Sequence, residues 1–352
     1  MKFKYIDKAR ATANACYGGN VDPIIKERLN REIEAFDKLE GIDDALDYMR
    51  DMLLKGEELY LPRLTLGNSL FLFLIGLNNI NPLPRHHYCP HCHAFHWGEK
   101  PANLCSCGTP YREEGFDLDF DLLEFDMKSK GFHLNYATGD TLLEKGLLRL
   151  KSDDNLSLAK CFGITEADLW EPPERIAETV EELRDFHRAK KDGQEPEGRA
   201  KGRLAYWIKL FNLSRFGELL EHYDVKTLEE LAGVICMTHG VDVAEANEKY
   251  IDATGKSYIA SRDELFTLLS GFDGIGKEGA CAIIRDIDRR GGGLSPEMER
   301  RLIDSGANSA MIGFLKRIAY IFPKAHSVCE TIVYLRIAAE ERATLDKSED
   351  TL

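Results

Sequence analysis

NPLPRHHYCPHCH at residues 81–93 and CSCGTPYREEGFDL at residues 105–118 decide how the rest of this chain is organised. Their cysteines form a C-x-x-C pair and a C-x-C pair: Cys89, Cys92, Cys105 and Cys107. Two chelating pairs separated by a loop supply the four soft ligands that tetrahedral Zn²⁺ takes in a closed, structural site. Three histidines of the same stretch are alternative ligands: His91, His93 and His96. We therefore predict a structural zinc module at residues 86–112.

Composition limits the classes of protein to which the chain can belong. Its 352 residues, 43% of them apolar, predict two or three domains with proper cores. The longest run without a polar side chain, Leu70–Leu77, is far shorter than the ~20 residues of a membrane-spanning helix. The N-terminal residues lack the apolar core of a secretory signal, so a cytoplasmic protein with no membrane partner is expected. In that compartment, clustered cysteines indicate metal binding rather than disulfides.

The charge of the chain is unevenly distributed. A formal net charge of -14 argues against a general nucleic-acid binder, because counterion release needs concentrated Lys and Arg. Residues 285–324 differ from the rest, since they hold eight Lys or Arg against five Asp or Glu. Any anion-binding face is expected there. An ordinary mixed-charge helical surface explains the same pattern.

Hydrophobic periodicity divides the chain into a mixed N-terminal half and a helical C-terminal half. Asp22–Pro23 predicts the start of a helix, and a second helix is expected over residues 43–54. Residues 59–80 are apolar and should be buried, while alternation within residues 116–136 predicts short strands.

The second half begins after a predicted linker. Apolar residues between Ile176 and Phe186 predict a helix that leads into a polar linker at residues 187–203. From Leu204 onward the pattern is helical, with turns expected at residues 271–276, 291–293 and 322–323.

Five stretches in one collinear order resemble the polymerase core of PolC-type DNA polymerase III alpha chains, which are C-family bacterial replicative polymerases. The stretches are residues 22–36, 81–118, 214–244, 261–302 and 314–338. An Asn-Pro-Leu-Pro run leading into Cys-Pro-x-Cys, and a second pair ending in Cys-Gly-Thr, are similar to the zinc-bearing palm segment of that family. The element FPKAH at Phe322–His326 is similar to its Phe-x-Lys-x-His signature. The resemblance covers about residues 8–340.

The resemblance implies a shortened chain of the α+β class, mostly helical. A small, degraded nucleotidyl-transferase-like palm with a zinc knuckle would precede an all-helical fingers-like domain. The implied parts are a helical lead-in at 1–58, a palm-like region at 59–140, a polar connector replacing deleted palm at 141–203, a fingers-like domain at 204–343 and a disordered tail at 344–352.

The catalytic motif of the family is the part that this chain does not keep. The resemblance implies a palm strand whose D-x-D aspartates hold two Mg²⁺ ions for phosphoryl transfer. Gly131 and His133 stand at those two positions, so Mg²⁺ is expected only if the chain is catalytic after all. The fallback carboxylates are Asp117, Asp119 and Asp121, which would project from one face of a strand. Acidic residues on the solvent face of an alternating strand are the alternative interpretation, and the usual exposure of carboxylates favours it.

The resemblance also implies residues that contact nucleotide or DNA. Arg63 belongs to the turn that cradles phosphates in the family, and the fingers-like residues would face the triphosphate or the templating strand. The predicted set is Arg63, Arg285, Arg289, Lys316, Arg317, Lys324 and His326. Gly274–Gly276 has the form of a helix–hairpin–helix turn, for which a simple glycine-capped turn is the alternative.

Three functional hypotheses follow. The first is a non-catalytic PolC-like pseudoenzyme that binds DNA primer–template, a nucleotide or a replisome protein. The second is an active DNA-directed DNA polymerase that uses the fallback carboxylates. The third is a protein-interaction decoy without a nucleic-acid role, which the acidic net charge favours.

Overall fold

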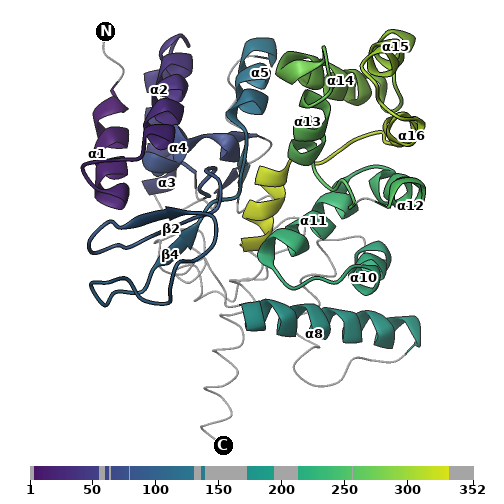
Figure 1. The fold of residues 1–352 in the computed structure, drawn as a ribbon, viewed down its shortest axis with the longest axis horizontal. Coiled ribbons are helices and arrows are strands. Elements are labelled where there is room, and N and C mark those ends of the chain that lie inside the picture. Colours follow the sequence, from purple (N-terminus) through teal and green to yellow (C-terminus); the bar gives the residue numbers. More distant parts are fainter. Residues whose placement is uncertain are drawn as a thin grey trace, which may run out of the picture. The chain divides into compact units, whose positions relative to one another are not determined.

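A computed structural model describes residues 4–54, 60–62, 65–78, 80–130, 136–138, 173–193, 213–255 and 257–332. The chain divides into two compact units, Met1–Gly139 and Asp140–Leu352 (Figure 1). Helices dominate the described residues, and a small antiparallel sheet accompanies them. The predicted mostly helical α+β class is therefore confirmed, while the palm-like and fingers-like assignments stay predictions.

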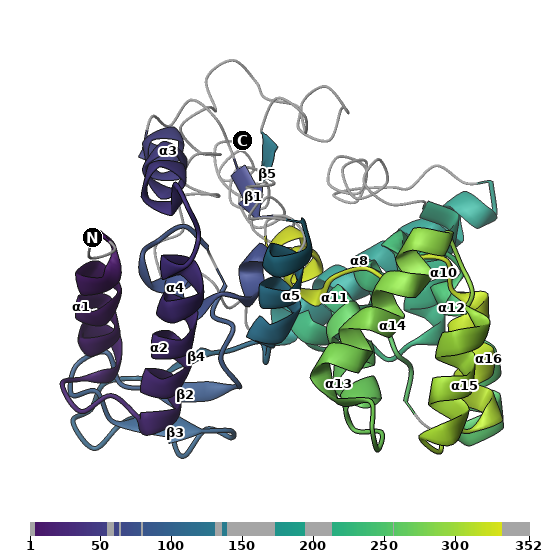
Figure 2. The same cartoon turned by 90° about the horizontal axis from the view of Figure 1, so that it is seen from above.

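Five α-helices and one short 3-10 helix build the first unit. They are α1 (Ile6–Tyr17), α2 (Pro23–Asp37), α3 (Ile42–Leu54), η1 (Leu66–Asn68), α4 (Leu70–Leu74) and α5 (Phe120–Lys130). The predicted start of α2 is confirmed, because the Asp22 side chain accepts a hydrogen bond from the backbone N–H of Ile24. Helix α4 packs against both α1 and α2, and the ring of Phe71 lies 5.2 Å from that of Phe36. The core of the unit lies between these helices (Figure 2).

The sheet of the first unit has the order β3-β2-β4. Its strands are β2 (His86–Tyr88), β3 (Phe95–Trp97) and β4 (Arg112–Glu114), all antiparallel. The central strand β2 is fully buried, and His86 on it packs against Tyr17 of α1. Burial lowers the pKa of His86 to about 4, so its imidazole belongs to the core as a neutral ring. A second pair joins β1 (Tyr60–Pro62) to β5 (Tyr136–Thr138).

One expected element is wrong. The alternation within residues 116–136 predicted strands, but α5 occupies residues 120–130, and β5 begins only at Tyr136, the last residue of that range. Asp119 explains the helix start, because its Oδ1 accepts a hydrogen bond of 2.9 Å from the backbone N–H of Asp121. Phe120, Leu123 and Met127 then recur at helical spacing and are buried.

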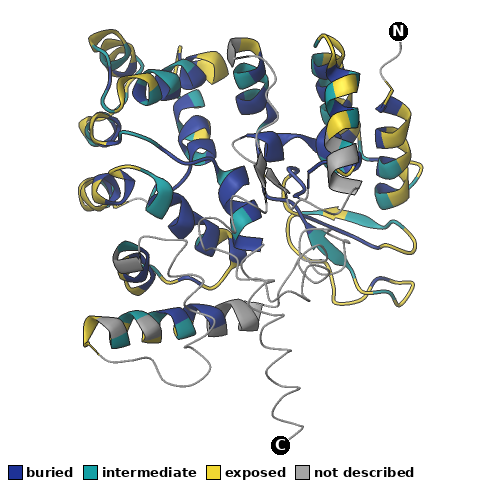
Figure 3. Cartoon of the chain, turned by 180° about the vertical axis from the view of Figure 1, so that it is seen from behind, coloured by how far each residue is buried: buried dark blue, intermediate teal, exposed yellow. Residues whose placement is uncertain are grey.

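The second unit is helical in its described residues. Its helices are α8 (Pro173–Lys191), α10 (Leu213–His222), α11 (Leu228–His239), α12 (Val243–Thr254), α13 (Arg262–Ser270), α14 (Gly276–Arg290), α15 (Pro296–Asp304), α16 (Ser309–Arg317) and a helical run at residues 324–332. The turns predicted at 271–276 and 291–293 are confirmed, whereas residues 322–323 form an irregular segment that leads into the helical run from residue 324 and not a turn. Helix α11 and the run at residues 324–332 are buried along most of their length, whereas the other helices of the unit carry both buried and exposed residues (Figure 3).

Helix α8 extends into the predicted linker. The linker was expected from residue 187, but α8 continues to Lys191. Arg188 explains the extension, since its guanidinium forms ion pairs with Glu181 and Glu221 and thereby fastens this end of α8 to α10. Within the described residues, no helix combines the length and the apolar character that crossing a membrane requires.

Candidate functional site

The four predicted cysteines come together as one thiol cluster. Their Sγ atoms all lie within 4.8 Å of one another. Cys89 Sγ is 3.5 Å from Cys107 Sγ, and Cys92 Sγ is 3.4 Å from Cys105 Sγ. In the part of the chain that the structure describes, this is the one group of three or more His, Cys, Asp or Glu side chains arranged to hold a metal ion.

Two tight turns of the backbone build the cluster. Cys89 follows β2 directly, and its Sγ accepts a hydrogen bond of 3.4 Å from the backbone N–H of Cys92. In the second turn the N–H of Gly108 donates to the carbonyl oxygen of Cys105 at 2.8 Å, and Gly108 has a φ of 85°. That left-handed conformation suits glycine, which is why the second pair ends in Cys-Gly.

Electrostatics around the thiols favour a bound cation. The backbone N–H of Cys107, followed by the Tyr111 hydroxyl, lowers the pKa of Cys105 to about 6. At Cys92 the backbone N–H of Ala94 acts to lower the pKa, but the neighbouring sulfurs of Cys105 and Cys89 raise it to about 12. Thiolates this close repel one another, and a divalent metal removes the repulsion. The donor set therefore fits Zn²⁺, held by all four cysteines.

The three alternative histidine ligands lie apart from this cluster. His93 Nδ1 is 3.2 Å from the carbonyl oxygen of Cys16, and His96 Nε2 is 3.2 Å from the Tyr111 hydroxyl. His91 is exposed. His93 also covers the end of α1, because a Cβ at Gly18 would lie only 2.9 Å from the His93 Cβ.

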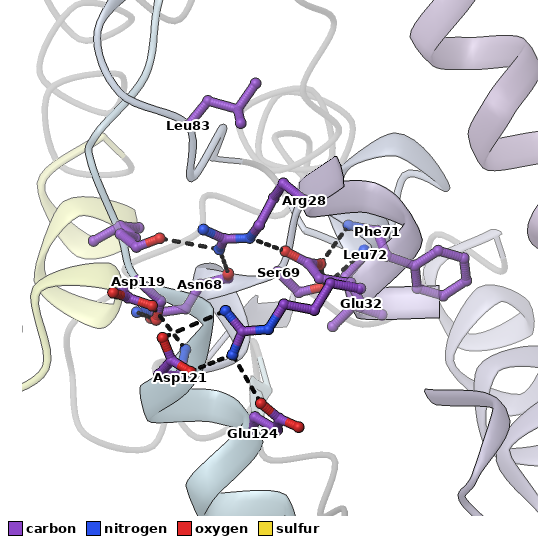
Figure 4. A network of polar contacts seen from close by, with 12 residues as sticks. Arg28, Glu32, Asn68, Ser69, Phe71, Leu72, Leu83, Asp119, Asp121 and Glu124 are labelled. Atoms are coloured by element: carbon purple, nitrogen blue, oxygen red, sulfur yellow. Dashed lines mark hydrogen bonds and ion pairs between the residues drawn. The ribbon is translucent and has the colours of Figure 1, made fainter. Parts of the chain in front are cut away.

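A buried carboxylate organises the turn that precedes α4. Glu32 of α2 has no exposed surface and is joined to the Arg28 guanidinium as an ion pair (Figure 4). Its Oε2 accepts hydrogen bonds of 2.8 Å each from the Ser69 hydroxyl and from the backbone N–H of Phe71. The resemblance places a phosphate-cradling turn next to these residues. In this chain, the Glu32 carboxylate accepts the hydrogen bonds that Ser69 and Phe71 donate.

Arg28 connects this turn to the segment before α5. Its Nη2 donates to the carbonyl oxygens of Asn68 at 2.7 Å and Leu118 at 3.1 Å. The Asn68 amide in turn donates to the Asp119 carbonyl oxygen at 2.9 Å. The segment around Asp119 is thus held to η1 by hydrogen bonds (Figure 4).

The fallback carboxylates do not converge on one point. Asp121 forms an ion pair with Arg31, which also bonds Glu124 at 2.8 Å. Asp119 caps α5, and Asp117 is exposed with a φ of 51°. The expectation that all three project from one face of a strand is wrong, because a turn and then a helix occupy these positions.

The positions that decide catalysis by resemblance lie elsewhere. Gly131, His133 and Arg63 are outside the described residues.

In the second unit, Lys324 is paired inside the fold. Its Nζ lies 3.0 Å from Glu229 Oε1, and its backbone N–H donates to Asp263 Oδ2 at 2.9 Å. Burial acts to lower the pKa of Lys324, but the Glu229 carboxylate and its hydrogen bond raise it. The ammonium therefore stays charged and is neutralised internally.

His326 belongs to a cluster around the carboxylate of Glu330, whose side chain is 12% exposed. Glu330 lies 3.2 Å from His326 Nε2 and 3.2 Å from His239 Nε2. The Phe322 ring stacks on the His239 imidazole, with centroids 4.8 Å apart, and lies tilted against the His326 imidazole at 4.7 Å. Burial acts to raise the pKa of Glu330, but the two imidazoles lower it to about 2. His239 is structural, as a histidine before a turn most often is.

The remaining predicted cations lie near the ends of α14 and α16. Lys316 Nζ pairs with Glu299 at 2.8 Å, and Arg317 Nη1 donates to the Gly313 carbonyl oxygen at 2.7 Å. Arg285 is half-buried one turn before Arg289, which is exposed. Lys324 and His326 are thus tied into the fold, while Arg289 and Arg317 point to solvent.

Sequence reasoning missed the roles of Glu32 and Glu330. Glu32 follows Arg28 by four residues on a helix, and Glu330 follows His326 by the same spacing. An i,i+4 pair on a helix is the sequence signal for such contacts. It does not reveal which pair is buried.

Comparison with known proteins finds relatives that are named DNA polymerase III PolC-type. That of Caldanaerobacter subterraneus subsp. tengcongensis is 24% identical over an alignment covering 93% of this chain. The protein of the same name from Mycoplasmopsis pulmonis is 25% identical over 68% of this chain. That of Streptococcus pyogenes serotype M3 is 30% identical over 39% of it. No family model matches the chain.

These relatives establish a PolC-like relationship, which confirms the resemblance. The chain spans about a third or less of their lengths, namely 32%, 17% and 11%. The first alignment runs over 457 positions, more than the 352 residues of this chain. That relative therefore carries residues within the aligned region that have no counterpart here.

Proposed function

We propose that this chain is a PolC-related protein that binds DNA primer–template without catalysing nucleotide transfer. The observation that carries the proposal is the use of the fallback carboxylates, since Asp119 caps a helix and Asp121 is paired with Arg31. Two-metal catalysis needs carboxylates that converge on the metals. Gly131 and His133, at the positions of the family's aspartates, supply none.

A primer-extension assay with Mg²⁺ or Mn²⁺ tests the absence of catalysis. We expect no template-dependent incorporation by the purified chain, although it retains a labelled primer–template at low salt. Robust incorporation that Asp119→Ala and Asp121→Ala abolish would establish the active polymerase instead. Glu34→Ala, on the exposed face of α2, is the control for nonspecific loss of activity.

We propose further that the four-cysteine cluster holds a structural zinc ion. We expect about one zinc ion for each chain by elemental analysis, because four thiolates complete a tetrahedral site. Cys92→Ser should lose the metal, whereas Cys16→Ser, outside the cluster, should keep it. Equal zinc content in the two variants would reject this site.

The internal pairing of Lys324 and His326 favours a second candidate, a protein-interaction decoy that competes for polymerase partners. It predicts no retention of labelled primer–template even at micromolar protein and low salt. A purified replisome protein would instead be captured by the chain. Salt-sensitive binding of DNA without such capture supports the first candidate.

A further inference from the structure

An arginine-bearing surface forms around Gly291–Gly293, here called the triglycine loop. Its three residues have φ values of 65°, 128° and 76°, which only glycine adopts without strain. The N–H of Gly293 donates to the Ile318 carbonyl oxygen at 3.3 Å, and a Cβ at Gly292 would lie 3.3 Å from the Ala319 Cβ. The loop thus packs directly on the segment after α16 and brings the ends of α14 and α16 together.

Four exposed cations meet at this junction: Arg289, Arg290, Lys316 and Arg317. Three acidic side chains of this region already form ion pairs or hydrogen bonds with other groups. Lys316 pairs with Glu299 and Arg262 with Asp288, while Asp286 accepts the N–H of Ser295 at 2.7 Å. Among the residues that the structure describes, neither Arg289 nor Arg290 has a carboxylate partner. The surface keeps an excess of positive charge in a chain whose formal net charge is -14.

The backbone of the loop decides which kind of anion this surface fits. The N–H groups of Gly291, Gly292 and Gly293 all donate to carbonyl oxygens of the fold, at 3.4, 3.2 and 3.3 Å. No nest of backbone amides is left to enclose a compact phosphate group. The donors on offer are guanidinium groups, which bond phosphate oxygens in pairs and project from an open surface. A row of phosphates along a strand matches this arrangement better than a single triphosphate.

We infer that the surface formed by Arg289, Arg290 and Arg317 binds the sugar–phosphate backbone of nucleic acid, whatever its base sequence. The inference rests on the proposed function and names the place where DNA is held. Arg289 and Arg317 belong to the set predicted from the resemblance, whereas Lys324 and His326 of the same set are paired with Glu229 and Glu330.

Fluorescence anisotropy with labelled single-stranded DNA and primer–template, over a range of NaCl concentrations, tests this inference. The variant is Arg289→Glu/Arg290→Glu in the full chain. Its matched control is Lys26→Glu/Lys249→Glu, which alters two other exposed cations and changes the net charge equally. We expect the arginine variant to bind at least about tenfold more weakly at low salt, with a shallower salt dependence, because two phosphate contacts are lost. The control should bind as the wild type does.

Three results separate this inference from the proposed function. Equal weakening in both variants, or a lower melting temperature with unchanged binding, overturns the inference, since the arginines would then only stabilise helix C-termini. Retention of primer–template in that case keeps the proposed function. Arginine-dependent binding of single-stranded DNA, with no binding of primer–template, supports the inference and rejects the proposed function. No DNA binding by the wild type rejects both.

Discussion

Glu32 in the first unit and Glu330 in the second are each held by several partners, and the chemistry of those partners differs. Glu32 is held by a guanidinium, a hydroxyl and a backbone N–H, whereas Glu330 is held by two imidazoles. Glu32 therefore forms a joint between α2 and the segment before α4, and Glu330 forms a joint between the helical run at residues 324–332 and α11.

The largest effect should come from breaking the joint of the first unit. Glu32→Gln leaves the Arg28 guanidinium without its carboxylate in a buried position, which costs about 3–5 kcal/mol of the free energy of unfolding. Chemical denaturation measures the loss, and hydrogen exchange should localise it to residues 65–71. Glu34→Gln on the exposed face of the same helix is the control. Similar destabilisation by both variants would contradict a joint specific to Glu32.

Breaking the joint of the second unit should cost less and depend on pH. Glu330→Gln removes a charge but keeps a polar group of the same shape, so about 1–3 kcal/mol is expected. The folded pKa of Glu330, about 2, lies below the unfolded value of ~4.3, so its contribution is full above that value and is lost as pH falls toward 2. Denaturation of wild type and variant at pH 6 and at pH 3 measures this. A difference that grows on acidification would refute the assignment.

A smaller loss of stability is expected from a second variant in the first unit. Asp119→Ala removes the cap of α5 but leaves the contact between its carbonyl oxygen and Asn68. The loss of an N-cap costs about 0.5–2 kcal/mol. Thermal denaturation should show this modest loss, and Asp119→Asn should recover most of it. A variant as damaging as Glu32→Gln would mean that Asp119 has a further role.

The smallest effect is expected at an exposed pair. Lys316→Ala breaks the contact with Glu299, and such surface pairs contribute about 0–1 kcal/mol. Its melting temperature should differ little from that of the wild type. A loss comparable with that of Glu330→Gln would show that the end of α16 is held more firmly than its exposure implies.

Local signals made part of this structure predictable. The cysteine pairs lie within nineteen consecutive positions of the sequence, and the cap of α2 is set by the adjacent residues Asp22 and Pro23. The predictions of the cysteine cluster and of the start of α2 were therefore correct. The strand prediction around Asp119 failed because the alternating apolar residues before α5 run directly into that helix. Asp119 caps the helix and its apolar residues recur at helical spacing, so the same sequence fits both patterns.

Partners that are distant in sequence explain the rest. Lys324 and Glu229 are 95 positions apart, and Glu32 finds its Phe71 donor 39 positions away. The chemistry of Lys324 in isolation favours an anion, and only the packing of its helix against α11 shows that a carboxylate already neutralises it. Residue type at a motif position therefore predicts what a side chain can bind, while tertiary contacts decide whether it is available.

The close approach of Gly18 and His93 has a mechanical consequence for the metal centre. With so little room between them, the turn after α1 and the first cysteine knuckle must take up their positions together. Extracting the ion with a chelator should therefore loosen the end of α1 as well. A protease that cuts after Tyr17 would then act on the metal-free protein sooner than on the loaded one.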